Sequence, residues 1–278
     1  MKLTADSGST KTEWVLTEKD KAVHWHAETE GLNPFHLNKK QMLDILQPMV
    51  ESMPNGGKTV CDVEFYGAGC ALPNRQEIVR RVLESLLPAG CRIQVESDLK
   101  GAAKAVCQGE AGICCILGTG SNSCQFDGQE IVTSTPSLGY ILGDEGSGAT
   151  LGCTLLNHVL KNLLPKHLCK AFVEEYDISL SKVLDSIYSQ PQAARYMAGF
   201  VPFLSKYREE PSIQELLAEE FEKFFQKNVI RAYDTTLPVH MVGSVAYVFK
   251  EELAKVTTSL GLITGRILRR PLETLLTT

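Results

Sequence analysis

Two short turns rich in glycine and hydroxyl residues constrain this chain more than any other feature. The first spans residues 6–12, Asp-Ser-Gly-Ser-Thr-Lys-Thr, and follows a short apolar strand at the N-terminus. The second spans residues 118–122, Gly-Thr-Gly-Ser-Asn, and follows a buried strand over residues 113–117. Glycine lets a backbone approach a ligand closely, while hydroxyl and exposed N–H groups suit phosphate oxygens. Either turn alone is weak evidence, because most glycine-rich turns only connect strands. The pair favours two phosphate-binding turns.

The segments around these turns repeat one plan. The first turn joins two strands of a three-strand meander, after which helical spacing alternates with short apolar strands. An alanine-rich helix begins after Ser97 and Asp98, and either side chain can cap it. The second turn opens another set of strands over residues 113–117, 123–126 and 130–133. The pattern predicts an α/β protein with two similar domains, residues 1–110 and 111–278, and a ligand cleft between them.

Most of the second half reads as helix. An acidic glycine loop, residues 143–148, precedes a helix predicted from about Ala149, which suggests a loop held against a ligand at a helix N-terminus. A solvated acidic turn explains the same residues equally well. Further helices are predicted over residues 191–204 and 211–233. Near the end of the chain, Gly243-Ser244 turns a short buried strand into a helix and is a third candidate for nucleotide contact.

Composition excludes several classes of function. The formal net charge is −5 and no basic block occurs, so we expect no nucleic-acid partner. No apolar run reaches the roughly 20 residues that span a bilayer, and the early acid Asp6 argues against a signal peptide. The nine cysteines include no C-x-x-C pair, so zinc and iron–sulfur sites lack an obvious ligand set. Several cysteines, including Cys61 and Cys91, lie in apolar runs and are predicted to be buried free thiols. We therefore expect a cytoplasmic protein.

Taken together, these motifs resemble a known superfamily. Residues 6–12 resemble the first phosphate motif of the actin, heat-shock chaperone and sugar kinase superfamily, and residues 118–122 resemble the second. Residues 242–245, Val-Gly-Ser-Val, resemble its adenosine motif. The second turn together with Leu142-Gly-Asp-Glu-Gly-Ser147 is similar to the N-acetylglucosamine kinase branch, in the group that includes the BadF/BadG-type ATPases. The resemblance implies two ribonuclease-H-like (actin-like ATPase) domains, the second with extra helices, closing over ATP and a sugar.

The resemblance also implies roles for particular residues. Asp98 matches the catalytic base of the family and also contacts the sugar. The matched sugar-binding positions are Asn33, Gly139 and Asp144. The matched ATP-binding positions are Ser9, Thr10, Lys11, Gly118, Thr119, Gly120, Ser121, Gly243 and Ser244. A homodimer is expected by the same resemblance.

The expected chemistry is transfer of the γ-phosphoryl group of ATP to an alcohol group of an amino sugar, most specifically the 6-hydroxyl of N-acetylglucosamine. Asp98 would accept the hydroxyl proton. Asp6, at a strand end beside the phosphates, suits Mg²⁺ held through water. One departure concerns the sugar loop, which is Ser137-Leu138-Gly139 here and Gly-Trp-Gly in the family, so the identity of the sugar stays open.

Two other functions remain as alternatives. The first is an ATPase that activates a reductase, as in the BadF-type group, whose cluster is held by cysteines in a glycine loop that this sequence lacks. The second is a sensor that binds sugar or nucleotide on the same fold without catalysis. The presence of Asp98 counts against the sensor.

Overall fold

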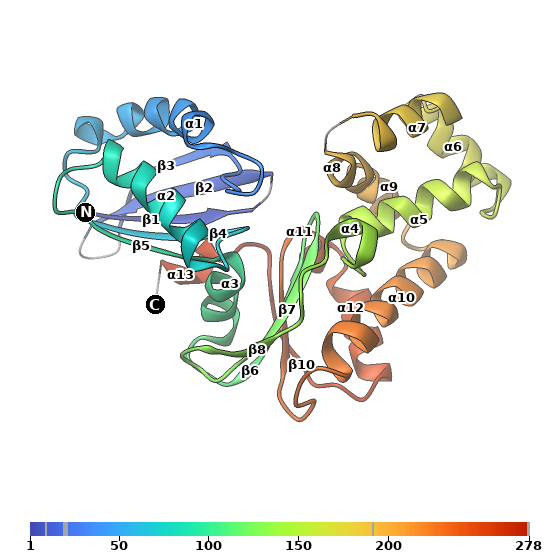
Figure 1. Cartoon of the computed structure of the whole chain (residues 1–278). Coiled ribbons are helices and arrows are strands. Elements are labelled where there is room, and N and C mark those ends of the chain that lie inside the picture. The colour runs from blue at the N-terminus through green and yellow to red at the C-terminus, as the bar shows by residue number, and fades with distance from the viewer. Residues whose placement is uncertain (9, 19–21, 191, 277–278) are drawn as a thin grey trace. The chain divides into compact units, whose positions relative to one another are not determined.

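The computed structural model of the chain describes residues 1–8, 10–18, 22–190 and 192–276. The chain divides into two compact units, each built on its own five-stranded mixed sheet (Figure 1). The first unit contains residues 1–108 and the segment from Pro271, and the second contains residues 109–270. No helix in the described ranges is both long and apolar enough to cross a membrane.

The first sheet has the strand order β3-β2-β1-β4-β5. Its strands are β1 (Lys2–Ser7), β2 (Lys11–Thr17), β3 (Val23–Glu30), β4 (Asp62–Gly67) and β5 (Arg92–Ser97). The first three pair antiparallel, which confirms the predicted meander, and β4 and β5 add in parallel beside β1. Because β1, β4 and β5 run in parallel, their carboxyl ends meet at one edge of the sheet. This edge carries Asp6 and leads directly into Asp98.

Helices cover both faces of this sheet. Helices α1 (Lys39–Ser52) and α2 (Pro73–Leu86) bury apolar side chains against one face, in a core that includes Trp14 and Phe65. A short 3-10 helix, η1 (Pro54–Gly57), follows α1. Helices α3 (Asp98–Cys107) and α13 (Leu272–Leu275) pack on the opposite face (Figure 1). Gly101 brings α3 close to the sheet, since a Cβ there would collide with the ring of Tyr66.

The end of the described chain returns to the first unit. The sequence-based division assigned this segment to the second domain, whereas α13 contacts α3 and β1. Leu272 and Leu275 are both buried there. Two leucines in a four-residue helix need an apolar surface from elsewhere, and the first unit supplies it.

The second sheet repeats the topology of the first. Its strands are β6 (Gly112–Leu117), β7 (Ser121–Phe126), β8 (Ile131–Ser134), β9 (Val239–Val242) and β10 (Thr264–Leu268). The order β10-β9-β6-β7-β8 again places three antiparallel strands beside two parallel additions. The duplicated α/β plan predicted from the two turns is therefore confirmed. Strand β10 was not predicted from the sequence.

Helices form the rest of the second unit. They are α4 (Gly139–Leu142), α5 (Gly148–Leu160), α6 (Lys166–Tyr176), α7 (Leu180–Tyr188), α8 (Ala193–Ala198), α9 (Val201–Lys206), α10 (Pro211–Phe225), α11 (Ser244–Val248) and α12 (Lys250–Ser259). The predicted helix over residues 191–204 is two helices, since the chain breaks at Gly199 and Phe200. The helix predicted over residues 211–233 changes after Phe225 into a π-helical turn, η2 (Gln226–Ile230).

All nine cysteines are free thiols, as predicted. The prediction that Cys61 and Cys91 are buried was wrong. Cys61 is exposed and Cys91 is only half-buried, because both precede a strand at the surface of the first unit. Apolar neighbours in the sequence do not bury a residue that lies just outside a strand.

Candidate functional site

Asp98 begins α3, directly after the carboxyl end of β5. Ser97 is the N-cap, as the sequence allows, and its hydroxyl accepts a hydrogen bond from the Lys100 N–H at 3.2 Å. The Asp98 carboxylate accepts one from the Leu99 N–H at 2.9 Å. Burial raises the pKa of Asp98 to about 6, although the backbone hydrogen bonds oppose this. A carboxylate with a pKa near neutrality is suited to accept a proton at physiological pH.

Asp6 lies at the end of β1, where the charge of Asp98 affects its ionisation. The pKa of Asp6 is raised to about 7, first by burial and then by the charges of Asp98 and Glu13, while Lys11 opposes the rise. No hydrogen bond or ion pair to the Asp6 carboxylate occurs among the described residues. The geometry brings together the two acids that the sequence selected, within one unit. Buried carboxylates that repel one another are a donor set that fits a hard divalent cation.

The turn after β1 is tight. Its Gly8 N–H donates to the Lys11 carbonyl at 2.9 Å. The buried Ser7 hydroxyl lies 2.7 Å from the Thr12 hydroxyl and accepts from the Leu32 N–H, so it stabilises the loop internally. Thr10 is half-buried in this turn, and Ser9 falls outside the described residues. Lys11 forms an exposed ion pair with Glu28 at 2.9 Å.

Asn33 lies in the loop after β3, against the glycine loop after β4. Its side-chain oxygen accepts a hydrogen bond from the Phe35 N–H at 2.9 Å, which fixes the turn. A Cβ at Gly69 would collide with that same oxygen, and Gly69 has φ +79°, so both sterics and backbone favour glycine here. Arg75 of α2 closes the loop by donating to the Pro34 carbonyl at 3.1 Å.

The second glycine turn joins β6 to β7 and rests on the start of α5. The Gly148 N–H donates to the Gly118 carbonyl at 2.8 Å, and the Ala149 N–H donates to the Thr119 carbonyl at 3.0 Å. Within the described ranges, the N–H groups of Thr119 and Gly120 donate no hydrogen bond. Two adjacent N–H groups without partners in a glycine turn are donors suited to a phosphate.

Gly243 supports this turn from β9. It has φ +125°, and a Cβ there would collide with the Leu117 carbonyl. The glycine therefore lets the end of β9 approach the end of β6. Ser244 follows as the first residue of α11 and is exposed. The structure thus places Gly243 beside the second turn, as the resemblance to an adenosine motif implies.

Asp144 folds back onto the same turn. The Ser121 N–H donates to its carboxylate at 3.2 Å, and Gly120 packs directly against it. Asp144 has φ +58°, a backbone conformation that aspartate tolerates better than most residues. Its pKa is raised by burial, against the hydrogen bond from Ser121. The acidic loop is therefore held against the second glycine turn and is not a solvated turn.

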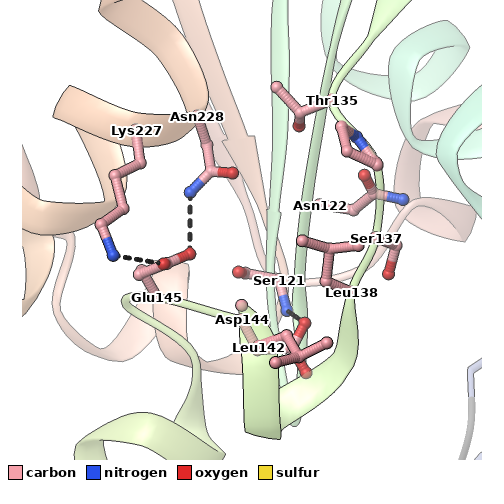
Figure 2. A pocket seen from close by; sticks show the side chains of 12 residues that line it. Ser121, Asn122, Thr135, Ser137, Leu138, Leu142, Asp144, Glu145, Lys227 and Asn228 are labelled. Carbon is pink, nitrogen blue, oxygen red and sulfur yellow. Dashed lines mark hydrogen bonds and ion pairs between the residues drawn. The ribbon is translucent and has the colours of Figure 1, made fainter.

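A cavity of about 280 Å³ opens beside Asp144 in the second unit (Figure 2). Gly139 lies near it at the start of α4, with φ +70°. The lining residues come from four segments of the chain and are Ser121, Asn122, Thr135, Pro136, Ser137, Leu138, Leu142, Gly143, Asp144, Glu145, Lys227 and Asn228. Eight of the twelve lining residues have polar or charged side chains, which can form hydrogen bonds to a polar ligand, and Leu138 and Leu142 add an apolar wall.

Two lining residues that bind Glu145 were missed by the sequence analysis. Lys227 and Asn228 belong to the π-helical turn η2, and both bind Glu145, at 2.8 Å and 3.2 Å (Figure 2). These residues are far from Glu145 in the sequence, and a lysine near the end of an amphipathic helix looks like a solvated residue. A π-turn within a helix often marks a functional site, but it is invisible without coordinates.

These geometries can be compared with known proteins. The sequence profile of the BadF/BadG/BcrA/BcrD ATPase family matches residues 5–246. This chain belongs to that family. Membership implies ATP binding, and the matched range contains both glycine turns.

Solved structures show the same fold. A protein of Porphyromonas gingivalis, provisionally named an N-acetylglucosamine kinase, is 40% identical to this chain with a TM-score of 0.96, over 100% of this chain and 98% of that one. A protein of Chromobacterium violaceum with the same provisional name is 20% identical with a TM-score of 0.65, over 99% and 97% of the two chains, and this likeness shows the fold alone. The predicted class, two actin-like ATPase domains, is confirmed.

A similarity to a curated protein is more distant. The N-acetyl-D-glucosamine kinase of Dictyostelium discoideum is 26% identical over 168 residues. The match covers 56% of this chain and 53% of that protein's length.

The candidate residues therefore form two sets. Asp6, Asp98 and Asn33 lie in the first unit, and the second turn, Gly243 and Asp144 lie in the second. That a cleft unites the two sets stays a prediction.

Proposed function

We propose that this chain is an ATP-dependent kinase of an amino sugar, with N-acetylglucosamine as the acceptor and its 6-hydroxyl as the reacting group. The observation that carries the proposal is Asp98, a carboxylate at a helix N-terminus beside Asp6 with a pKa raised to about 6. General-base catalysis needs a group that is ionised near neutral pH yet basic enough to take a proton. The names of the relatives in Porphyromonas gingivalis and Dictyostelium discoideum support the same substrate.

The second unit would bind the nucleotide through its glycine turn. Thr119 and Gly120 would donate N–H groups to phosphate oxygens, and Gly243 and Ser244 would lie on the adenosine side. Thr10 and Lys11 are further candidates for phosphate contact. Mg²⁺, held through Asp6, would supply neutralisation of phosphate charge, which is the main need of phosphoryl transfer.

The cavity beside Asp144 would hold the sugar. The Asp144 carboxylate would accept hydrogen bonds from sugar hydroxyls, and Asn33 is a further candidate for sugar contact. Leu138 and Leu142 offer an apolar wall, and Leu138 stands where the family resemblance leads one to expect tryptophan. Because one or two loop contacts decide between similar sugars, this wall is the part of the site most able to alter specificity. We also propose that the protein is cytoplasmic and forms a homodimer.

Release of ADP with MgATP tests the proposal, measured against N-acetylglucosamine, glucosamine, N-acetylmannosamine, N-acetylmuramic acid and glucose. We expect turnover with an N-acetylated sugar and a loss of roughly 100-fold or more in kcat for Asp98→Asn, the size typical of a missing general base. Asp44→Asn, on the exposed face of α1, is the matched control and should keep wild-type turnover.

Other outcomes would redirect the assignment. Full sugar-dependent turnover in Asp98→Asn would remove Asp98 as the base. Silence with every sugar, together with retained ATP binding, would favour a sensor or a reductase activator. Iron in anaerobically purified protein would then separate the activator from the sensor.

A further inference from the structure

Glu13 stands directly beside Asp6 in the first sheet. The antiparallel register pairs Asp6 of β1 with Glu13 of β2, and directly opposed residues project from the same face with Cβ atoms about 5 Å apart. Glu13 is only 8% exposed. Burying one carboxylate opposite a second one costs free energy unless a nearby cation balances the negative charge.

His26 fixes the position of Glu13. Its Nε2 lies 3.0 Å from Oε1 of Glu13, and it projects from the edge strand β3. The next residue on that face of β3, Glu28, is directly opposite Glu13 and forms its ion pair with Lys11. The potential ligand atoms of Glu13, His26 and Glu28 all lie within 4.8 Å of one another. Carboxylates at metal sites are themselves held by hydrogen bonds from neighbouring groups, and His26 is placed to make such a bond to Glu13.

The charge of Glu13 reaches Asp6. The two carboxylates are directly opposed across the β1–β2 pair, so their like charges repel one another. Glu13 therefore does more than join β2 to β3. A hydrated divalent cation at Asp6 would experience the negative charge of both side chains. Mg²⁺ usually retains several bound waters, and a neighbouring carboxylate can accept hydrogen bonds from them.

We infer that Glu13 is a further residue of the cation site at Asp6, and that His26 is the residue that positions it. Glu13 supplies negative charge and an acceptor oxygen to the hydration shell of the ion. His26 holds that oxygen in place by a hydrogen bond and acts through Glu13 alone. The inference rests on the proposed function for the cation site itself and adds two residues that the phosphate motif does not identify.

Binding of Mn²⁺ to the full-length protein with ADP present, followed by the electron paramagnetic resonance signal of free Mn²⁺, tests the inference without any turnover. We expect Glu13→Gln, which keeps the shape of the side chain, to raise the dissociation constant for Mn²⁺ by about 10-fold or more. His26→Gln should raise it by a smaller factor. The matched control is His24→Gln, the same substitution at another exposed histidine of β3, which pairs with Glu18.

The controls separate two kinds of failure. If Asp6→Asn weakens Mn²⁺ binding while Glu13→Gln and His26→Gln bind like the wild type, the inference is wrong and the cation site stands. If Asp6→Asn also binds like the wild type, the cation site of the proposed function is wrong. Thermal unfolding of each variant identifies any that fails to fold. If Glu13→Gln does not fold, the Mn²⁺ affinity of His26→Gln decides the test, because His26 lies at an exposed position.

Discussion

Asp6 and Asp98 come from strand ends that the topology places at one edge of a sheet, so the ionisation of each depends on the other. The pKa of Asp6 is raised to about 7 and that of Asp98 to about 6, in both cases chiefly by burial. The sequence selected Asp6 by its place in the first phosphate motif and Asp98 by its resemblance to the catalytic base of the family. It could not indicate their shifted pKa values, because these depend on residues distant in the chain that surround them.

Asp6→Asn tests this coupling through stability. The folded pKa of Asp6 lies above its unfolded value, so the folded protein binds the proton more tightly and loses stability as pH rises from about 4 to about 7. Removing the charge should therefore increase the free energy of unfolding at pH 8 by about 4 kcal/mol and change it little at pH 4. Urea unfolding without divalent ions measures both values, with Asp44→Asn as control. An equal effect at both pH values would contradict the shift.

At the scale of elements, one tyrosine joins the segments that line the cavity. The Tyr233 hydroxyl donates to the Ser123 carbonyl at 2.8 Å and accepts from the Thr135 N–H at 2.8 Å. The Ser123 hydroxyl in turn donates to the Asn228 carbonyl at 2.8 Å. These bonds connect β7, the loop before α4 and the turn η2. Periodicity predicts helices and strands, but such bonds between distant elements leave no trace in it.

Tyr233→Phe should loosen the cavity without removing a lining side chain. The substitution leaves the Thr135 N–H without this partner, and we expect it to cost about 1–3 kcal/mol of stability. Sugar KM should rise more than kcat falls, because the loop loses its position and the reacting groups do not change. Steady-state kinetics and urea unfolding measure these effects, and Tyr188→Phe, at an 81% exposed position, is the control. An unchanged KM would show that the loop holds its position without the tyrosine.

At the scale of the whole molecule, the chain builds the same strand order twice and then returns to the first unit. The segment from Pro271 groups with residues 1–108, and α13 buries Leu272 and Leu275 against it. Two similar glycine turns allowed the duplication to be predicted. The return of the chain was not predicted, because a four-residue helix carries too little periodicity to reveal its partner.

Leu272→Ala should destabilise the first unit, although Leu272 lies far from it in the sequence. Truncation of a buried leucine typically costs about 2–5 kcal/mol through lost burial and the cavity that remains. Hydrogen exchange resolved along the chain should show faster exchange in β1 and α3, with the helices of the second unit unaffected. Leu163→Ala, at a 62% exposed position, should change neither. Faster exchange confined to the second unit would contradict this packing.

The sequence by itself determined the duplicated α/β plan, both glycine turns and the acids Asp6, Asp98 and Asp144. The plan and the turns are encoded locally, in the glycines that a tight turn requires and in the alternation of apolar residues, whereas the three acids were selected by their resemblance to family positions. Only the tertiary structure decided that Glu13 lies opposite Asp6, that His26 holds Glu13, and that Lys227 and Asn228 meet Glu145. Strand register and helix packing create these contacts between residues distant in the chain, and no local pattern records which distant residues will meet.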